Sequence, residues 1–391
     1  MSQAADTVAR PRSGERALLG VMVAIVLLAL NLRTLVASLP PLLDDIRADL
    51  GLSGLAGGLL TTLPVLGFGA FAPLAPRLSR RVSIERLLVA CALLTAVAAG
   101  VRGSGGIAPL YVGCALAGVA VGIAQVLIPV FIRTCHPEAT GTLTGAYSMS
   151  LVLGATLAAA LAVPLEEWLG SWEASLAAWS VPALVAAAVW MPRALQPGTI
   201  VRGERPPGLW GNRLAWNVSL YMGVQSMAFY AGLSWIPTVL EDNGYSAGTA
   251  GALQALSALV QLAPAFLLPV LAARRRDQVS LLWWIVLLQL FGALGLLLWI
   301  VVLGLGQGGA LGLGLILPVL RGGGTASVAA LTAMSLCVGY MVAAAGPWLL
   351  GAVHDAFGGW SVALIVFAAI CLLELAPGLP AARARTLEGR T

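Results

Sequence analysis

One arginine lies inside a long apolar run near the beginning of this chain of 391 residues. Arg33 falls in the run 17–39, which holds no other charged residue. Burying a charged side chain in hydrocarbon costs at least about 2.5–3.5 kcal/mol, so such residues usually face a water-filled cavity and mark a substrate path. The guanidinium stays protonated and offers a planar fork of N–H donors to an anion. Arg33 is therefore the leading candidate for anion binding.

The position of Arg33 along its helix leaves an alternative open. It lies 16 residues after Ala17, or about 24 Å along a helix, so its side chain could also extend to the outer headgroups. Asn31 is about 200° away around the helix, and both side chains cannot face one cavity without a distortion. Asn31 is kept as a secondary candidate.

A second set of candidates lies in the apolar run 213–238. Gln225 and Phe229 share one stripe at helical spacing, and Tyr230 borders it. When Pro41 is matched with Pro237, Phe229 takes the position equivalent to Arg33 in the second half of the chain. A charge on one side and an aromatic face on the other suit a flat, delocalised anion or a heteroaromatic ring. The alternative is that these aromatic rings only pack between helices.

Polar side chains in other apolar runs extend the list of candidate substrate contacts. Hydrogen bonding between helices is the alternative interpretation for each of them. These residues are Gln125, Tyr147, Ser148, Gln254, Gln261, Gln307 and Tyr340.

The elements that carry these residues are predicted from composition. Hydrophobic residues make up 59% of the chain and charged residues 10%, which excludes a soluble globular protein and a disordered one. An apolar helix of about 20 residues spans a membrane, and residues 280–320 are long enough for two, with a turn expected at Gly292 and Gly295. Twelve runs result: 17–39, 53–76, 84–101, 108–132, 142–164, 172–191, 213–238, 247–272, 279–294, 296–320, 326–350 and 361–379.

The distribution of positive charge supports the count of twelve. All 22 basic residues are arginine. With the N-terminus inside, 19 of them fall on the inner side, while Arg47 and Arg102 fall in outer loops, as the positive-inside rule requires. We therefore expect both termini in the cytoplasm. The arginines form no clustered basic face, so nucleic-acid binding is not predicted, and the five cysteines lack metal-ligand spacing.

The chain also repeats itself at about half its length, with an offset of 193 residues. Gly51 matches Gly244 and Ser53 matches Ser246. Two six-helix halves in parallel repeat predict an all-α membrane protein with twelve transmembrane helices in two pseudo-symmetric bundles and a site between them. The expected domains are an N-terminal bundle, a cytoplasmic linker and a C-terminal bundle, at 1–192, 193–212 and 213–391.

Several segments resemble the cyanate-porter and 2-nitroimidazole-transporter branch of the major facilitator superfamily. They are Ala29–Ser53, Gly58–Arg81, Trp235–Gly251 and Leu303–Leu313. The resemblance covers essentially the whole chain and implies the major facilitator fold and secondary transport of a small anionic or planar polar solute. Two departures weaken any proton-coupling scheme taken from relatives: Pro76 stands where an Asp is usual, and the usual Arg of the fourth helix is absent from Leu110–Gly122.

The scarcity of acidic residues within the spans bears on the substrate. Spans 1, 2, 4, 5, 7, 8, 10 and 11 contain no Asp or Glu, and Glu374 in the twelfth span is expected at the cytoplasmic interface. An unpaired arginine without nearby carboxylates favours an anionic substrate over a cationic one.

The predicted function is that of a monomeric secondary carrier in the inner membrane of a bacterium, without a cofactor. It would move a cyanate-like, carboxylate or nitroimidazole-like solute by alternating access, and a proton could enter with a weak acid. One alternative is an exporter of neutral drug-like aromatic compounds. A membrane-embedded enzyme is a remote alternative, because the spans hold no recognisable catalytic arrangement of residues.

Overall fold

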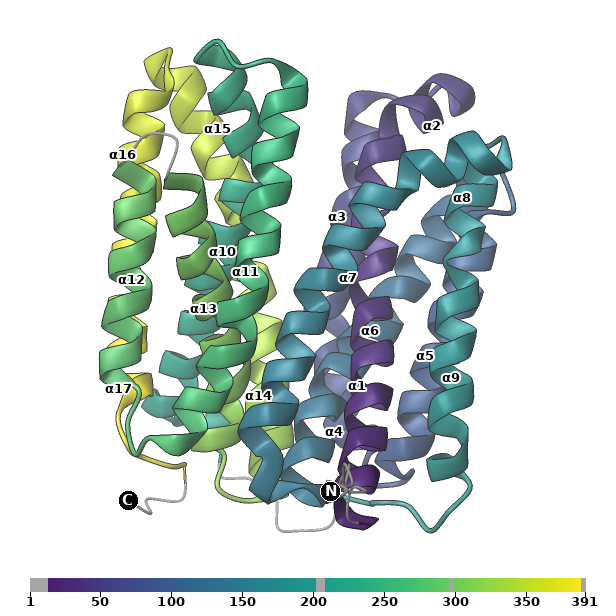
Figure 1. Ribbon diagram of the computed structural model, residues 1–391, viewed down its shortest axis with the longest axis vertical. Helices are drawn as coiled ribbons and strands as arrows, with labels where there is room; N and C mark the ends of the chain where they lie inside the picture. Colours follow the sequence, from purple (N-terminus) through teal and green to yellow (C-terminus); the bar gives the residue numbers. More distant parts are fainter. Residues whose placement is uncertain (1–12, 202–207, 295–298, 388–391) are drawn as a thin grey trace, which may run out of the picture.

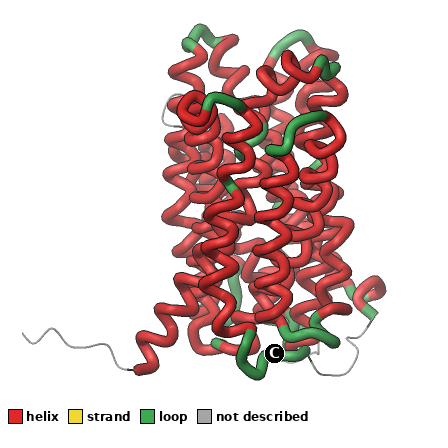
Figure 2. The backbone as a smooth tube through the Cα atoms, turned by 90° about the vertical axis from the view of Figure 1, so that its right-hand side faces the viewer, coloured by secondary structure: helices red, strands yellow, loops and turns green. Residues whose placement is uncertain are grey.

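The computed structural model describes residues 13–201, 208–294 and 299–387, which form helices joined by short loops (Figure 2). The first half of the chain forms α1 (Ser13–Ala37), α2 (Leu43–Leu50), α3 (Gly54–Phe71), α4 (Ala75–Leu78), α5 (Ile84–Arg102), α6 (Ile107–Cys135), α7 (Thr140–Leu169), α8 (Trp172–Ala178) and α9 (Ser180–Ala194). The second half forms α10 (Arg213–Asp242), α11 (Ala247–Arg274), α12 (Val279–Leu294), α13 (Trp299–Arg321), α14 (Thr325–Ala343), α15 (Ala345–Phe357), α16 (Trp360–Leu373) and α17 (Leu375–Ala382).

Twelve membrane-spanning segments account for most of these helices. Among the described residues, ten segments are long and apolar enough to cross a membrane. The other two are α12, whose apolar part is shorter, and α10, which is 30 residues long and carries more polar side chains. The predicted turn at Gly292 is wrong, because α12 continues through this residue to Leu294. Gly295 lies outside the described residues.

The internal repeat is visible in the way equivalent helices begin and end. Gly51 follows α2 with φ +63° and Gly244 follows α10 with φ +88°, a conformation that costs glycine little. Ser53 and Ser246 then cap the next helices, each Oγ accepting a bond of 3.2 Å from a backbone N–H three residues on. The matched residues therefore perform the same structural task in both halves.

A pair of side-chain bonds repeats as well. The indole of Trp172 donates to Asp49 at 3.1 Å in the first half. The indole of Trp360 donates to Asp242 at 2.6 Å in the second half. In both halves this bond joins the start of the sixth span of the bundle to the last helical turns of its first span.

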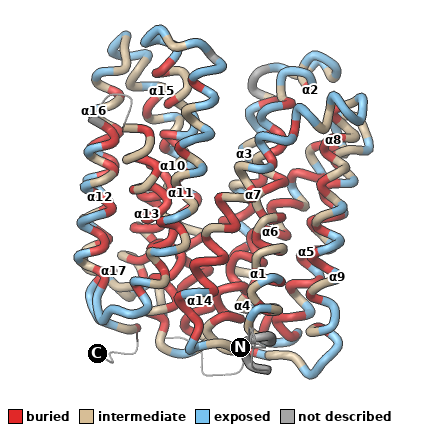
Figure 3. The backbone as a smooth tube through the Cα atoms, viewed as in Figure 1, coloured by how far each residue is buried: buried red, intermediate tan, exposed pale blue. Residues whose placement is uncertain are grey.

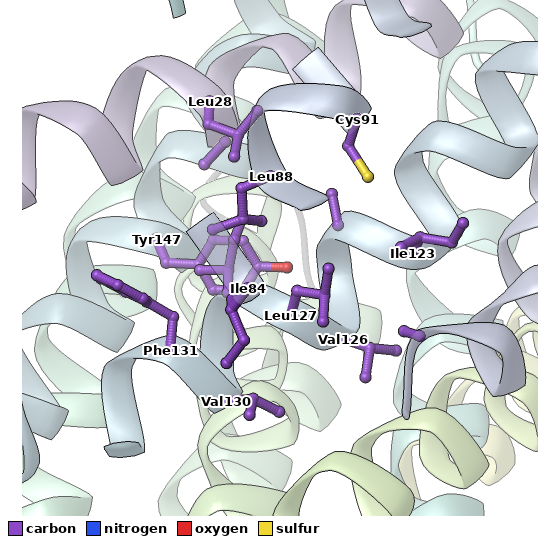
Figure 4. Close-up of a cluster of buried hydrophobic side chains, with 14 of the residues drawn as sticks. Leu28, Ile84, Leu88, Cys91, Ile123, Val126, Leu127, Val130, Phe131 and Tyr147 are labelled. Carbon is purple, nitrogen blue, oxygen red and sulfur yellow. The ribbon is translucent and has the colours of Figure 1, made fainter. Parts of the chain in front are cut away.

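The helices form two bundles that lie side by side (Figure 1). We call the lower side of Figure 1, where α1 begins and α17 ends, the terminal side, and the opposite side the far side. The core of the first bundle joins Leu28 of α1, Leu88 of α5, Leu127 of α6 and Tyr147 of α7 (Figure 4). Burial is densest toward the terminal side (Figure 3).

The two bundles contact each other mainly toward the terminal side. There α7 packs on α11, with Gly141 and Gly145 against Pro269 and Phe266. The bundles diverge toward the far side (Figure 1). Glycine allows this contact because an added Cβ at Gly145 would collide with the Phe266 carbonyl oxygen.

Close packing within the first bundle also depends on glycine. An added Cβ at Gly118 of α6 would lie 2.9 Å from the Cα of Gly67 in α3, and one at Gly122 would lie 2.9 Å from the Phe68 carbonyl oxygen. The glycine step Gly118–Gly122 therefore brings α6 against α3, as small residues do at helix interfaces in membranes.

Two charged residues lie in places that the sequence did not predict. Arg102 was expected in an outer loop, but it is the last residue of α5 and is fully buried. Glu374 was expected at the interface, but it is also fully buried, at the junction of α16 and α17. Both predictions were therefore wrong. In each case a neighbouring helix packs over a residue near the end of an apolar run.

Candidate functional site

The guanidinium of Arg33 lies between the two bundles. Its Nη1 donates to the Tyr230 hydroxyl of α10 at 2.9 Å. Its Nη2 donates to the Tyr340 hydroxyl of α14 at 3.1 Å. Both partners belong to the second half of the chain, so this side chain is turned toward the opposite bundle and not outward to the headgroups.

The position of Arg33 is fixed by the end of its helix. α1 ends at Ala37 because Pro40 begins the next turn, and a proline cannot continue the ladder of backbone bonds. This leaves the Leu35 carbonyl, two residues beyond Arg33, free to accept a bond from Nη1 of the buried Arg102. A cation at a helix C-terminus also interacts favourably with the helix dipole, so Arg102 holds the segment that carries Arg33.

Tyr340 links Arg33 to the first bundle through a second bond. Its hydroxyl accepts from Arg33 and donates to Gln125 Oε1 of α6 at 2.9 Å. Tyr340 and Gln125 are buried, with 2% and 1% of their surface exposed. A chain of hydrogen bonds therefore runs from α1 to α14 and back to α6, and it crosses between the bundles twice.

Two polar atoms beside this chain have no partner among the described residues. They are Nε2 of Gln125 and the hydroxyl of Tyr147. Tyr147 of α7 is buried and close enough to interact electrostatically with Arg33 and Tyr340. Buried donors rarely stay unpaired, so these two atoms are available to a bound acceptor.

Phe68 of α3 completes the surroundings of Arg33 and was missed by the sequence analysis. The guanidinium carbon lies 5.9 Å from the centre of the Phe68 ring, within the range of a cation–π contact. The same ring meets Tyr340 edge-on at 5.3 Å. Its flanking glycines were the available signal, since Gly67 and Gly69 let neighbouring helices approach the ring closely.

The structure brings together five residues of the predicted set, which we call the Arg33 group. They are Arg33, Gln125, Tyr147, Tyr230 and Tyr340. Phe229 lies beside them, because its ring packs at 5.3 Å and 75° against Tyr230.

Asn31 lies elsewhere. Its amide donates to the carbonyls of Leu27 in α1 and Pro182 in α9, so it belongs to the packing of the first bundle. Ser148 bonds the Ala265 carbonyl of α11 and thereby joins the bundles at the terminal side. The structure separates both residues from the Arg33 group.

Of the predicted glutamines of the second half, three are buried and Gln254 is half-buried. The amide of Gln225 donates to Ser226 Oγ at 2.6 Å and to the Met222 carbonyl at 3.1 Å, both on its own helix. The four predicted glutamines that have no bond to the Arg33 group are Gln225, Gln254, Gln261 and Gln307.

Gln307 of α13 lies close to α10, because an added Cβ at Gly232, two residues after Tyr230, would lie 3.0 Å from its Nε2. This Nε2 has no partner among the residues that the structure describes. Gln254 on α11 has an unpartnered Oε1. Gln261 is buried where α11 meets Gly308 of α13.

A cavity of about 270 Å³ lies at the terminal side, apart from the Arg33 group. It is bounded by Arg77 and Arg80 of the first bundle and by Cys337 of α14. None of the twelve predicted site residues lines it.

Comparison with known proteins gives a consistent result. The family model described as Major Facilitator Superfamily matches residues 21–344. The 2-nitroimidazole transporter of Escherichia coli (strain K12) is 35% identical over 375 residues, covering 93% of this chain and 95% of the relative. The cyanate transport protein CynX of the same strain is 31% identical over 366 residues, covering 91% of this chain and 95% of the relative.

A solved structure shares the fold. The proton:xylose symporter XylE superposes with a TM-score of 0.76 over 96% of this chain and 98% of that structure. The sequence identity is only 15%, so this likeness shows the fold and nothing about the solute.

Proposed function

The chain belongs to the major facilitator superfamily, and on this premise we propose that it is a secondary carrier for a small anionic or planar polar solute. Transporters named for 2-nitroimidazole and cyanate among its relatives support this class of solute. Transport would proceed by alternating access, in which one half rocks against the other around a site between them.

The observation that carries the proposal is the charge state of the Arg33 surroundings. Within the described residues, Arg33 bonds only to the hydroxyls of Tyr230 and Tyr340, and no carboxylate forms an ion pair with it. A guanidinium stays protonated, so the site has a positive charge that neutral partners do not compensate. An anion would supply that compensation and would also accept bonds from the unpaired donors of Gln125 and Tyr147.

The aromatic rings around the site favour a flat solute. Phe68 meets Tyr340 edge-on and Phe229 meets Tyr230 edge-on, and Arg33 bonds to the hydroxyl of both tyrosines. Planar rings and delocalised anions present faces and edges that suit such surroundings. The same rings also support the second candidate, an exporter of neutral drug-like aromatic compounds.

The contacts between the bundles indicate which state the structure represents. The bundles contact each other mainly toward the terminal side. We place that side in the cytoplasm because the connecting loops there carry Arg80, Arg81, Arg275 and Arg276. The structure would then face outward, in a bacterial inner membrane. One chain supplies both halves of the site, so we propose a monomer.

Uptake into proteoliposomes tests the proposal. Purified protein is first screened by thermal shift against cyanate, nitrate, small carboxylates, 2-nitroimidazole and neutral aromatic compounds, since a ligand that binds the folded state raises its apparent stability. Uptake of the best ligand is then compared between the wild type and Arg33→Gln.

We expect anion flux to fall at least about tenfold in Arg33→Gln. A hydrogen bond to a charged group contributes roughly 1.4 kcal/mol or more, and its loss weakens anion binding by that factor. Arg77→Gln, at an exposed arginine of the terminal side, serves as the matched control and should retain flux. Undiminished anion flux in Arg33→Gln would refute anion binding. Flux of neutral aromatics that survives in the same variant would favour the second candidate.

A further inference from the structure

A carboxyl group is buried inside the second bundle, away from the Arg33 group. Glu374 is fully buried where α16 ends and α17 begins. Its Oε2 accepts a bond of 3.4 Å from Nε2 of Gln289 in α12, a residue that is itself 1% exposed. The pair therefore ties α12 to the twelfth span.

Each member of this pair has one oxygen that lacks a partner among the described residues. These atoms are Oε1 of Glu374 and Oε1 of Gln289, and both are buried. Two acceptors cannot satisfy each other, and leaving both unpaired in an apolar interior is costly. A hydrogen on Glu374 Oε1 would make this oxygen a donor, which is what an unpaired amide oxygen requires.

Within the part of the chain that the structure describes, no cation lies beside Glu374 to balance a negative charge. The titratable side chains that interact with it are Tyr221 of α10 and Cys371 of α16, and both are neutral in their ordinary form. Helices α12 and α17 contain no titratable residue, and the only one in α13 is Arg321. Arg321 bonds instead to Gln278 and to the carbonyls of Ala381 and Ala382.

We infer that Glu374 and Gln289 form a buried proton-binding site, in which neutral Glu374 donates its O–H to Gln289 Oε1. The amide already donates to Glu374 Oε2, so the two side chains would form a closed pair with one bond in each direction. A protonated carboxyl has the donor that this arrangement requires. An ionised one would leave an unpaired charge in a low-dielectric interior.

The site is distinct from the proposed solute site. Glu374 contacts α12 and lies beside α10, whereas Arg33 is bonded to α10 and α14 at the contact between the bundles. The bound proton stabilises the association of α12 with the end of α16. Binding of this proton does not depend on the identity of the solute.

Glu374→Gln is the informative variant, because a second amide can form the same two bonds with Gln289 without a bound proton. Infrared spectra of the full-length protein at neutral pH would be compared between wild type and variant. The expected difference is loss of the carbonyl band of a protonated carboxyl group. Glu241→Gln, at an exposed residue, is the control and should remove a carboxylate band. Loss of a carboxylate band in Glu374→Gln would overturn the inference.

A measurement on the wild type guards against a variant that does not fold. The unfolded carboxyl titrates near pH 4.3 while the folded one keeps its proton, so the unfolded state binds fewer protons above that pH. The unfolding equilibrium constant should then rise about tenfold per pH unit until the folded protein releases the proton. Stability that is equal at about pH 5 and about pH 8 would overturn the inference, and so would a slope that Glu374→Gln leaves unchanged.

Discussion

Replacing Tyr340 by phenylalanine tests whether the hydrogen-bonded chain beside Arg33 acts as one unit. The change removes a hydroxyl that accepts from Arg33 at 3.1 Å and donates to Gln125 at 2.9 Å. A bond to a charged group contributes about 1.5–3 kcal/mol, and a buried polar group left unpaired costs about 1–3 kcal/mol. Since both tyrosine and glutamine are almost completely buried, water cannot replace the lost partner.

The magnitude follows from a double-mutant cycle. We expect Tyr340→Phe alone to lower the free energy of unfolding by about 2–4 kcal/mol. Gln125→Leu alone should also destabilise, because it leaves the Tyr340 hydroxyl without its acceptor. In the Tyr340→Phe background, however, Gln125→Leu removes an amide that has already lost its partner, so the second change should be neutral or stabilising. The coupling energy should therefore reach about 1–3 kcal/mol.

The assay is denaturant unfolding of the ligand-free protein in detergent, with all four members of the cycle measured under one condition. Tyr221→Phe is the matched control, because Tyr221 is equally buried but its hydroxyl bonds the Ala310 carbonyl at 3.4 Å. Its effect should add to that of Gln125→Leu within about 0.5 kcal/mol. If the effects of Tyr340→Phe and Gln125→Leu on the free energy of unfolding also add within about 0.5 kcal/mol, the claim that these residues form one network is refuted.

Two further changes test the packing that positions the site. Gly145→Ala places a methyl group against the Phe266 carbonyl, which should destabilise the conformation with the terminal side closed by about 1–3 kcal/mol. The equilibrium constant between this conformation and the one that opens the terminal side should therefore shift about 5- to 150-fold toward the open one. The rate at which Cys337 reacts with a thiol reagent should rise, whereas Gly100→Ala, with open space around it, should leave that rate unchanged. Arg102→Met should alter the free energy of unfolding by less than about 1 kcal/mol, because the lost bond to α1 is offset by removal of an incompletely partnered buried charge. Destabilisation above about 3 kcal/mol in denaturant unfolding would contradict that balance.

From the amino-acid sequence alone we predicted the fold class and the leading candidate site residue, Arg33. Apolar runs of membrane-spanning length predict helices, because lipid offers no hydrogen-bond partner to backbone groups and a helix satisfies them within one segment. Matched residues such as Ser53 and Ser246 revealed the repeat, because each helix start needs its own cap. Arg33 stood out because a charge inside an apolar run is costly wherever the helix packs.

Which polar residues contact one another depends on how the helices pack and could not be predicted from the sequence. Arg33, Asn31 and Arg102 all lie in or next to apolar runs, yet one turns to the opposite bundle, one bonds to α9, and one caps the end of α1. Helical spacing tells which residues share a face but not which helix that face meets. The rotation of each helix depends on contacts such as the close approach of Gly122 in α6 to the Phe68 backbone in α3, which joins residues far apart in the chain. The burial of Glu374 has the same origin, because α12 covers it and no local pattern records that contact.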